Sequence, residues 1–282
     1  MAKTRRGLMT PLARGFADGS ALAISEAMPQ HEASALPPLP GPRAALFLDF
    51  DGTLIEIAPR PDAVVVPPDL PVLLARLSGQ LGGAVAIVTG RGLDVARGLT
   101  GNPPVGFACE HGTVIDASGI GAAIPPLPEP SGPPEGWREA AAEFVADRPG
   151  MLLEHKNYGF VLHFRAVPER GEEATTFLQR MVEGTHFQVI PAHAAAELRP
   201  KGSDKGVATD WLMRHPPFAG RIPVFIGDDV TDEDGMRAAR AHGGAGYRVP
   251  ECFPAGPADV RAWLLRLAES LPATTQPAEG AA

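Results

Sequence analysis

Four short apolar runs, each followed by polar side chains, constrain the fold more than any other feature of this sequence. The runs span 44–48, 84–88, 105–108 and 223–226, and the polar residues that follow them include Asp49, Thr89, Glu110 and Asp228. An uninterrupted apolar run without alternation indicates a strand that is buried on both faces. Since ligands of a parallel α/β sheet bind beyond the carboxyl ends of its strands, we expect these four polar residues to meet at one edge.

Helical segments between these runs predict an α/β fold with a Rossmann-like parallel sheet. Segment 70–81 carries leucines at positions 70, 73, 74 and 77, and two glycines follow it. Apolar residues at that spacing indicate an amphipathic helix, and glycine is common directly after a helix. Strands that alternate with helices predict right-handed crossovers between parallel strands.

The middle of the chain follows another pattern, in which a proline-rich connector over 124–136 precedes helices and paired strands. The expected elements are a helix at 137–147, strands at 151–155 and 158–165, a helix at 169–183, and strands near 186–190 and 194–198. Adjacent strands after a helix predict antiparallel pairing, so we expect an α+β cap domain inserted into the parallel core. Residues 200–202, Pro-Lys-Gly, are the expected return hinge.

The predicted domain organisation has three parts. Residues 1–42 are expected to form a flexible N-terminal tail that ends in a stiff proline-rich spacer, with an additional helix over 21–28 as the alternative. Residues 43–119 and 200–282 are expected to form the core, and residues 120–199 the cap.

Composition argues against several classes of function. The formal net charge is -8, whereas nucleic-acid binders usually carry a basic excess. No apolar run approaches the roughly 18 residues of a membrane span, and none follows the basic N-terminal residues as in a secretory signal. The two cysteines, Cys109 and Cys252, provide no disulfide framework or zinc quartet, which favours a reducing cytoplasmic location. These patterns make no prediction of the oligomeric state.

The run Asp49-Phe50-Asp51-Gly52-Thr53 carries the chemistry. It places two carboxylates, a glycine that permits a tight turn and a threonine hydroxyl directly after a buried strand. Main-chain amides in such a loop can bind an anion, and magnesium takes oxygen ligands from carboxylates and phosphate together. A simple Asx turn is the alternative for these five residues taken alone, but Asp228 and the other strand ends favour a phosphate site.

Four motifs in order resemble those of the haloacid dehalogenase superfamily of phosphatases. They are the run 49–53, Thr89 at the end of its strand, Lys205 within 201–206, and the segment 227–233, GDDVTDE. Within that superfamily the chain most resembles the trehalose-6-phosphate phosphatases, over roughly residues 43–271. The matching segments are 88–91, 110–112, 153–156, 163–165, 197–200 and 227–233. One departure is Cys109-Glu110, where the family often has Glu-Asn or Ala-Glu before its His-Gly.

The resemblance implies a two-step, Mg²⁺-dependent hydrolysis of a phosphate ester. Asp49 is expected to attack phosphorus and form an aspartyl phosphate, while Asp51 protonates the leaving oxygen and then activates water. This role requires a protonated Asp51, so we expect burial or neighbouring carboxylates to raise its pKa. Thr89 and Lys205 are expected to hold phosphoryl oxygens. The implied metal ligands are Asp49, Asp51, Asp228 and Asp229, and whether Asp229 or Asp232 orients Lys205 stays open.

Sugar specificity is expected from the cap and from the loops that follow two core strands. The implied substrate contacts are Gly90, Arg91, Glu110, His111, Lys156 and Glu197. Several of the expected site residues have simpler alternatives: Lys205 as a solvated lysine, Thr89 as a helix N-cap, Arg91 as a surface charge, His111 as packing in a turn, and Lys156 and Glu197 as members of cap salt bridges. Glu154, His163 and Arg199 are expected to form salt bridges within the cap.

The function that the resemblance implies is hydrolysis of trehalose 6-phosphate to trehalose and phosphate, with functional pairing to a trehalose-6-phosphate synthase. A phosphatase for another sugar phosphate, such as sucrose phosphate or mannosylphosphoglycerate, is the nearest alternative, and a phosphomannomutase-like phosphotransferase is a further one. A non-catalytic regulatory lobe belongs to another class. The presence of Asp49, Asp51, Lys205 and Asp228 argues against it.

Overall fold

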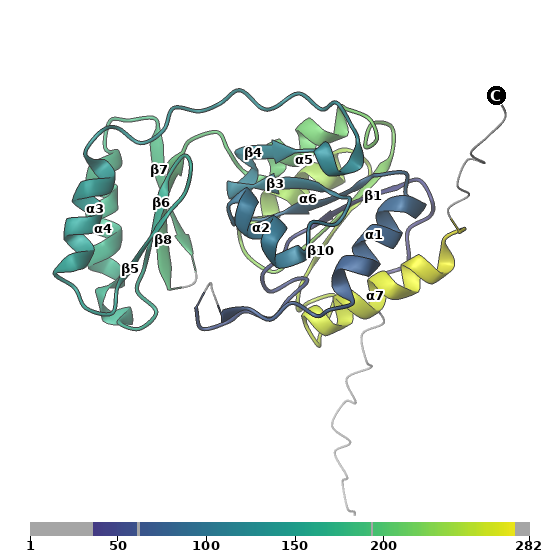
Figure 1. Cartoon of the computed structure of the whole chain (residues 1–282), viewed down its shortest axis with the longest axis horizontal. Helices are drawn as coiled ribbons and strands as arrows, with labels where there is room; N and C mark the ends of the chain where they lie inside the picture. The colour runs from purple at the N-terminus through teal and green to yellow at the C-terminus, as the bar shows by residue number, and fades with distance from the viewer. Residues whose placement is uncertain (1–35, 61–62, 193, 274–282) are drawn as a thin grey trace, which may run out of the picture. The chain divides into compact units, whose positions relative to one another are not determined.

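A six-stranded sheet with the order β10-β9-β1-β2-β3-β4 lies at the centre of the core (Figure 1). The structure, a computed structural model, describes residues 36–60, 63–192 and 194–273. The core strands are β1 (Ala44–Leu48), β2 (Val85–Val88), β3 (Gly106–Cys109), β4 (Val114–Asp116), β9 (Ile222–Gly227) and β10 (Ala245–Arg248). Since β1 pairs in parallel with both β2 and β9, and β2 with β3, the predicted parallel α/β core is confirmed.

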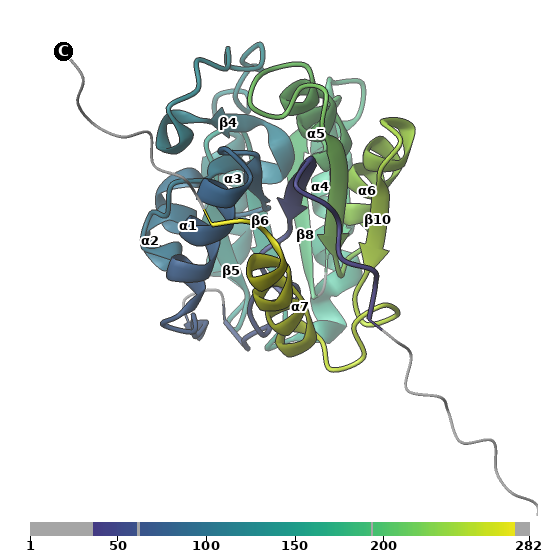
Figure 2. The same ribbon diagram turned by 90° about the vertical axis from the view of Figure 1, so that its right-hand side faces the viewer.

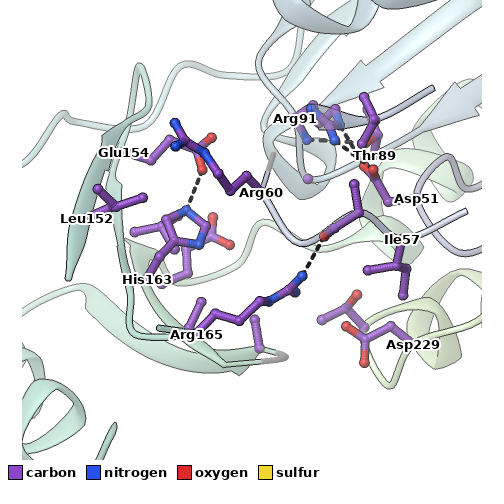
Figure 3. Close-up of a pocket in the computed structure, with 18 of the residues that line it drawn as sticks. Asp51, Ile57, Arg60, Thr89, Arg91, Leu152, Glu154, His163, Arg165 and Asp229 are labelled. Atoms are coloured by element: carbon purple, nitrogen blue, oxygen red, sulfur yellow. Dashed lines mark hydrogen bonds and ion pairs between the residues drawn. The ribbon is translucent and has the colours of Figure 1, made fainter. Parts of the chain in front are cut away.

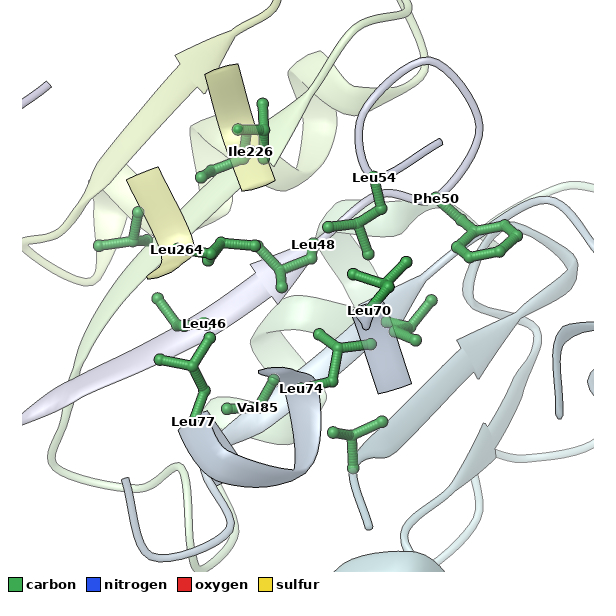
Figure 4. Packing of buried hydrophobic residues seen from close by; sticks show 14 of the residues in the cluster. Leu46, Leu48, Phe50, Leu54, Leu70, Leu74, Leu77, Val85, Ile226 and Leu264 are labelled. Atoms are coloured by element: carbon green, nitrogen blue, oxygen red, sulfur yellow. The ribbon is translucent and has the colours of Figure 1, made fainter. Parts of the chain in front are cut away.

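Helices cover both faces of this sheet because successive strand residues point in opposite directions. The core helices are α1 (Leu70–Gln80), α2 (Leu93–Thr100), α5 (Lys205–Met213), α6 (Asp232–Ala241) and α7 (Pro257–Ser270). Leu46 and Leu48 of β1 pack with α1 and α7 in one apolar cluster (Figure 4), and these two helices lie side by side (Figure 2). Phe47 packs with α5 and α6 in the other cluster. The apolar run 44–48 is therefore a strand without a solvent-facing side.

The two edge strands, β4 and β10, are absent from the sequence prediction. β4 runs antiparallel to β3. Only η2 (Glu110–Gly112), a three-residue 3-10 helix, and Thr113 join them, whereas a parallel crossover needs about a dozen residues. β10 pairs in parallel with β9, but its four half-buried residues form no continuous apolar run, so the sequence pattern misses it.

The segment between the two halves of the core forms an α+β cap, as predicted. Its sheet has the order β5-β6-β8-β7, and every pair is antiparallel. The cap elements are α3 (Trp137–Ala146), β5 (Leu152–His155), β6 (Phe160–His163), η4 (Pro168–Arg170), α4 (Gly171–Val182), β7 (Phe187–Ala192) and β8 (Ala195–Pro200). The strand predicted at 158–165 is thus shorter, and Pro200 of the predicted hinge is the last residue of β8.

The two faces of the cap sheet have different surroundings. Phe160 and Leu162 of β6 pack against α3 and α4 in an apolar cluster. The alternate residues Val161 and His163 point to the opposite face, where they line a cavity together with Glu197 of β8. The cap helices therefore bury one face and leave the other for the site.

Residues 36–42 lie against the core. Leu36 and Leu39 are partly buried against its apolar cluster, and the Pro37 carbonyl accepts a 2.7 Å hydrogen bond from the Trp263 indole. The spacer at the end of the expected 1–42 tail is therefore in contact with α7. The predicted tail over 1–35 and its alternative helix over 21–28 lie outside the described residues.

None of the helices in the described ranges combines the length and the apolarity that crossing a bilayer requires.

The indole of Trp263 gives a test of the core packing. It is fully buried, with Phe253 6.1 Å away in an edge arrangement. We expect Trp263→Ala to lower the free energy of unfolding by about 3–5 kcal/mol, because it leaves a cavity and removes the bond to Pro37. Leu265→Ala on the same helix, where Leu265 is 46% exposed, should cost less than about 1 kcal/mol. Urea unfolding followed by circular dichroism measures both, and equal losses would contradict this packing.

Candidate active site

The carboxyl edge of the core sheet borders a cavity of about 860 Å³ that the cap also lines (Figure 3). Asp228, Asp49 and Thr89 follow the neighbouring strands β9, β1 and β2, and all three residues border the cavity. They therefore meet at one edge, which is what the strand pattern predicts. Glu110 follows β3, one strand farther away, and is not among the residues that line the cavity.

Three buried charges form the floor of this site. The Lys205 ammonium lies 2.6 Å from Asp49 Oδ1 and 2.6 Å from Asp232 Oδ1, and all three side chains are almost inaccessible. Burial disfavours the charge of Lys205, but the two carboxylates outweigh it and raise the pKa of Lys205 above its usual range. Burial, followed by the charge of Asp232, raises the pKa of Asp49, and Lys205 opposes that rise.

The starts of two helices hold this charge cluster. Lys205 is the first residue of α5, whose N-cap Asp204 accepts a 2.8 Å bond from the amide of Val207. Asp232 is the first residue of α6, and its Oδ2 accepts the amides of Asp228 and Asp229 at 3.1 and 3.0 Å. Asp232, not Asp229, therefore contacts Lys205, which answers the question that the sequence left open. Lys205 is 3% exposed, so it is not a solvated lysine.

Asp49, Asp228 and Asp232 together could hold a metal ion. One carboxylate oxygen of each lies within 4.8 Å of the others. Burial and the charge of Asp232 raise the pKa of Asp228 to about 6, so the carboxylates repel one another. Oxygen donors of this kind suit a hard divalent cation, whose charge would offset that repulsion. The donor set therefore fits a divalent metal.

The other two predicted metal ligands have different partners. Both oxygens of Asp51 lie 2.7 Å from the guanidinium of Arg91 (Figure 3), and Asp229 Oδ1 accepts the amide of Val230 at 2.6 Å. Neither Asp51 nor Asp229 belongs to the three-carboxylate cluster. The proposed role of Asp51 predicts a buried carboxyl group or one beside other carboxylates. In the structure, both of its oxygens instead pair with the Arg91 guanidinium.

Gly52 brings the first motif against the fourth. Its φ is +81°, a conformation that L side chains rarely adopt, and a Cβ placed there would lie 2.1 Å from Asp228 Oδ2. Only glycine therefore allows the Asp228 carboxylate this close to the turn after Asp49.

Thr89 and Gly90 shape the loop after β2. Thr89 is 1% exposed and its hydroxyl accepts the amide of Arg91 at 3.2 Å. The N-cap residue of α2 is Gly92, so Thr89 does not cap that helix. A Cβ on Gly90 would lie 2.5 Å from His111 Nε2, so glycine lets the imidazole approach the loop.

The cap places a second set of polar residues around the cavity. Lys156 Nζ donates to the Gly90 carbonyl and lies 3.2 Å from Glu154. His111 Nε2 lies 2.8 Å from Glu197 Oε2. Burial lowers the pKa of His111, and the neighbouring Glu197 carboxylate opposes that lowering. Although burial opposes ionisation of Glu197, His111, Lys156 and Arg199 lower its pKa to about 2.

Glu110 differs from the expected sugar contact. Its two carboxylate oxygens accept the main-chain amides of Asn157 and Tyr158 at 2.9 and 3.2 Å. Those amides belong to the turn between β5 and β6 of the cap. The carboxylate is therefore engaged with the protein main chain.

Glu154 and His163, expected only as a cap salt bridge, also line the cavity. They lie 2.7 Å apart (Figure 3). Burial opposes ionisation of Glu154, but His163 and Lys156 lower its pKa to about 2. The period-2 pattern would have revealed their position, because Glu154 and His163 alternate with the residues buried under the cap helices. Arg199 is buried and does not line the cavity.

This fold defines a class: α/β proteins with an α+β cap inserted into a parallel-sheet core, a fold shared with a solved haloacid dehalogenase-like structure from Bacteroides thetaiotaomicron, with a TM-score of 0.55 at 13% identity over 79% of this chain and 98% of that one. The chain belongs to the trehalose-phosphatase family, to which residues 47–262 match. A probable trehalose-phosphate phosphatase of Sinorhizobium fredii is 38% identical over 229 aligned residues, with 76% of this chain and 80% of that relative covered. The sequence resemblance to this family is thereby confirmed.

Two further relatives agree. The trehalose-6-phosphate phosphatase of Escherichia coli is 32% identical over 237 residues, with 80% of this chain and 87% of that protein covered. The C-terminal domain of the Candida albicans trehalose-6-phosphate phosphatase has the same fold, with a TM-score of 0.66 at 22% identity over 81% of this chain and 93% of that one.

Removal of the buried cation gives a test of the charge cluster. We expect Lys205→Met to lower the free energy of unfolding in metal-free buffer by about 3–5 kcal/mol, because Asp49 and Asp232 are left buried without their partner. Lys201→Met, at an exposed lysine four residues earlier, should change it by less than about 1 kcal/mol. Urea unfolding measures both, and a stable Lys205 variant would contradict this assignment.

The low pKa of Glu197 predicts a pH dependence of stability. The usual pKa of a glutamate is 4.5, and the pKa of Glu197 in the folded protein is about 2. Between these values the unfolded chain binds more protons than the folded one, so the contribution of Glu197 is complete above about pH 4.5 and is lost towards pH 2. As the pH falls from about 4.5 to 2, urea unfolding should show a smaller decrease in the free energy of unfolding for Glu197→Gln than for the wild type. The exposed control Glu143→Gln should keep the wild-type slope, and equal slopes in all three proteins would contradict the prediction.

Proposed function

We propose that this chain hydrolyses trehalose 6-phosphate to trehalose and phosphate through an aspartyl-phosphate intermediate. The observation that carries the proposal is the position of Asp49. It lies beside a buried lysine and two further carboxylates at one wall of a cavity, and a cap face that carries Glu154, Lys156 and Glu197 lines the other wall. Membership of the trehalose-phosphatase family supports this substrate.

The proposed reaction has two steps, and both take place at Asp49. A carboxylate oxygen of Asp49 attacks phosphorus, the bond from phosphorus to the sugar oxygen breaks, and Asp51 gives its proton to that oxygen. Water then attacks the phosphorus of the aspartyl phosphate while Asp51 takes a proton from that water, and the bond from phosphorus to the Asp49 oxygen breaks, which regenerates the Asp49 carboxylate and releases phosphate. Lys205 and Thr89, both at the cavity, hold phosphoryl oxygens in both steps.

Arg91 has a double role in this proposal. It pairs with both oxygens of Asp51 and also borders the cavity. Because guanidinium groups bind phosphate strongly, a phosphate in the cavity competes with Asp51 for Arg91. Substrate binding thereby releases the Asp51 carboxylate, which takes up a proton from solvent before it protonates the leaving oxygen.

Mg²⁺ is the proposed metal. Asp49, Asp228 and Asp232 offer oxygen ligands, and Asp51 and Asp229, which the resemblance implies, remain part of the proposed surroundings. When bound, the ion supplies positive charge that lets an anionic phosphate approach the carboxylates. A cytoplasmic location and functional pairing with a trehalose-6-phosphate synthase belong to the same proposal.

The sugar binds on the cap side of the cavity. Its volume of about 860 Å³ is within the range of roughly 300–1,000 Å³ typical of small-molecule sites. The proposed hydroxyl partners are Gly90, Arg91, His111, Lys156 and Glu197, all of which line it. Carboxylate, imidazole and ammonium groups suit sugar hydroxyls, which both donate and accept hydrogen bonds.

Phosphate release from a panel of sugar phosphates, with and without Mg²⁺, tests this function. We expect the highest kcat/KM on trehalose 6-phosphate, and little turnover after chelation. The panel includes sucrose phosphate, mannosylphosphoglycerate and a hexose phosphate. Strong activity on one of these beside weak activity on trehalose 6-phosphate would overturn the substrate, and no activity on any would indicate a silent lobe.

The nucleophile has its own test. Asp49→Asn should lower kcat at least about a thousandfold, since an amide cannot form the acyl phosphate. The control is Asp94→Asn, at an exposed position on α2, which should keep wild-type turnover. Normal Mg²⁺-dependent activity of the Asp49 variant would exclude the covalent mechanism.

A further inference from the structure

Glu110 is a core residue that holds the cap by its main chain. Each of its carboxylate oxygens accepts one amide of the β5–β6 turn, from Asn157 at 2.9 Å and from Tyr158 at 3.2 Å. The Glu110 side chain is buried, with 4% of the residue exposed. Hydrogen bonds to a carboxylate are stronger than those between neutral groups. Glu110 therefore binds the tip of a cap hairpin to the core through two main-chain amides of the cap.

The backbone around Glu110 is built to present it to the cap. Glu110 and His111 both have left-handed conformations, with φ of 49° and 56°. Their amides donate to the carbonyls of Arg91 and Thr89, each at 3.0 Å, which ties this turn to the loop after β2. From this turn Glu110 reaches the β5–β6 turn, while His111 reaches Glu197 on β8. Two adjacent core residues thus contact two different parts of the cap.

The turn held by Glu110 carries Lys156 next to Asn157. Lys156 lines the cavity, donates to the Gly90 carbonyl and pairs with Glu154. The contact between His111 and Glu197 also joins cap and core, but those residues line the cavity, where a substrate competes for them. Glu110 does not line the cavity, so its hold on the turn can persist when the substrate is bound.

We propose that Glu110 is a positioning residue that docks the β5–β6 turn on the core and thereby places Lys156 at the sugar side of the cavity. Its effect on turnover rests on the proposed function, whereas the docking does not. Glu110 acts on the reaction through the cap main chain and Lys156, not by touching the sugar.

Hydrogen exchange of the unliganded protein tests the docking. In Glu110→Ala, the amides of Asn157 and Tyr158 should exchange at least about tenfold faster than in the wild type, because both lose their acceptor. Glu110→Gln keeps one acceptor oxygen and should give a smaller increase. The amide of Leu162 within the cap sheet should stay protected in both variants, and Glu143→Gln, on the exposed face of α3, should match the wild type throughout. Unchanged exchange at Asn157 and Tyr158 in Glu110→Ala would overturn the docking.

Kinetics on two substrates test the consequence for the reaction. Glu110→Ala should lower kcat/KM for trehalose 6-phosphate at least about tenfold more than kcat/KM for p-nitrophenyl phosphate, which carries no sugar for the cap to bind. Equal losses on both substrates would overturn the positioning role. If the wild type does not hydrolyse trehalose 6-phosphate, the proposed function fails, while the exchange measurement still decides the docking.

A double-variant cycle tests whether Glu110 acts through Lys156. Lys156→Ala should itself lower kcat/KM for trehalose 6-phosphate. Adding Glu110→Ala to it should cause a much smaller further loss than Glu110→Ala causes alone, since the group that Glu110 positions is already gone. Losses that simply multiply would overturn the route through Lys156 and would indicate a direct sugar contact by Glu110.

Discussion

The site depends on one buried ammonium group between two carboxylates. Lys205, Asp49 and Asp232 come from the start of α5, the end of β1 and the start of α6, and each is almost fully shielded from water. An isolated charge at such a position is costly, so the three groups are stable only together. Their pairing fixes two helix starts relative to the central strand, and it holds the Asp49 carboxylate at the cavity in one orientation.

Core and cap contribute different chemistry to the cavity. The core edge provides carboxylates and a lysine that suit a metal ion and a phosphate, whereas the cap provides Glu154, Lys156 and Glu197. Both contributions follow from sheet geometry, since the core site lies beyond the strand ends and the cap site lies on the sheet face opposite its helices. A phosphate bound at the core edge can therefore have its organic part against the cap.

Much of the fold could be predicted from the sequence because its signals are local. The strand at 44–48 is an unbroken apolar run, and the helix at 70–81 has leucines at helical spacing. Both elements occur in the structure at nearly the predicted bounds. β10 and β4 could not be predicted in the same way. The strand β10 has no continuous apolar run, and the direction of β4 depends on the short turn over Glu110–Gly112.

By itself, the sequence determined the parallel core, the inserted cap and the order of Asp49, Thr89, Lys205 and Asp228, because each depends on a short run of neighbouring residues. Only the tertiary structure decided which side chains touch. It placed Asp232 against Lys205, Arg91 against Asp51, and Glu110 against the amides of the cap turn. Lys205 and Asp232 are 27 positions apart in the sequence, and Lys205 and Asp49 are 156 positions apart. No local sequence pattern specifies a partner at such a separation. The physical reason is that a buried charged group is stable only when it is paired or hydrogen-bonded, and the available partners are the groups that the folded chain places beside it.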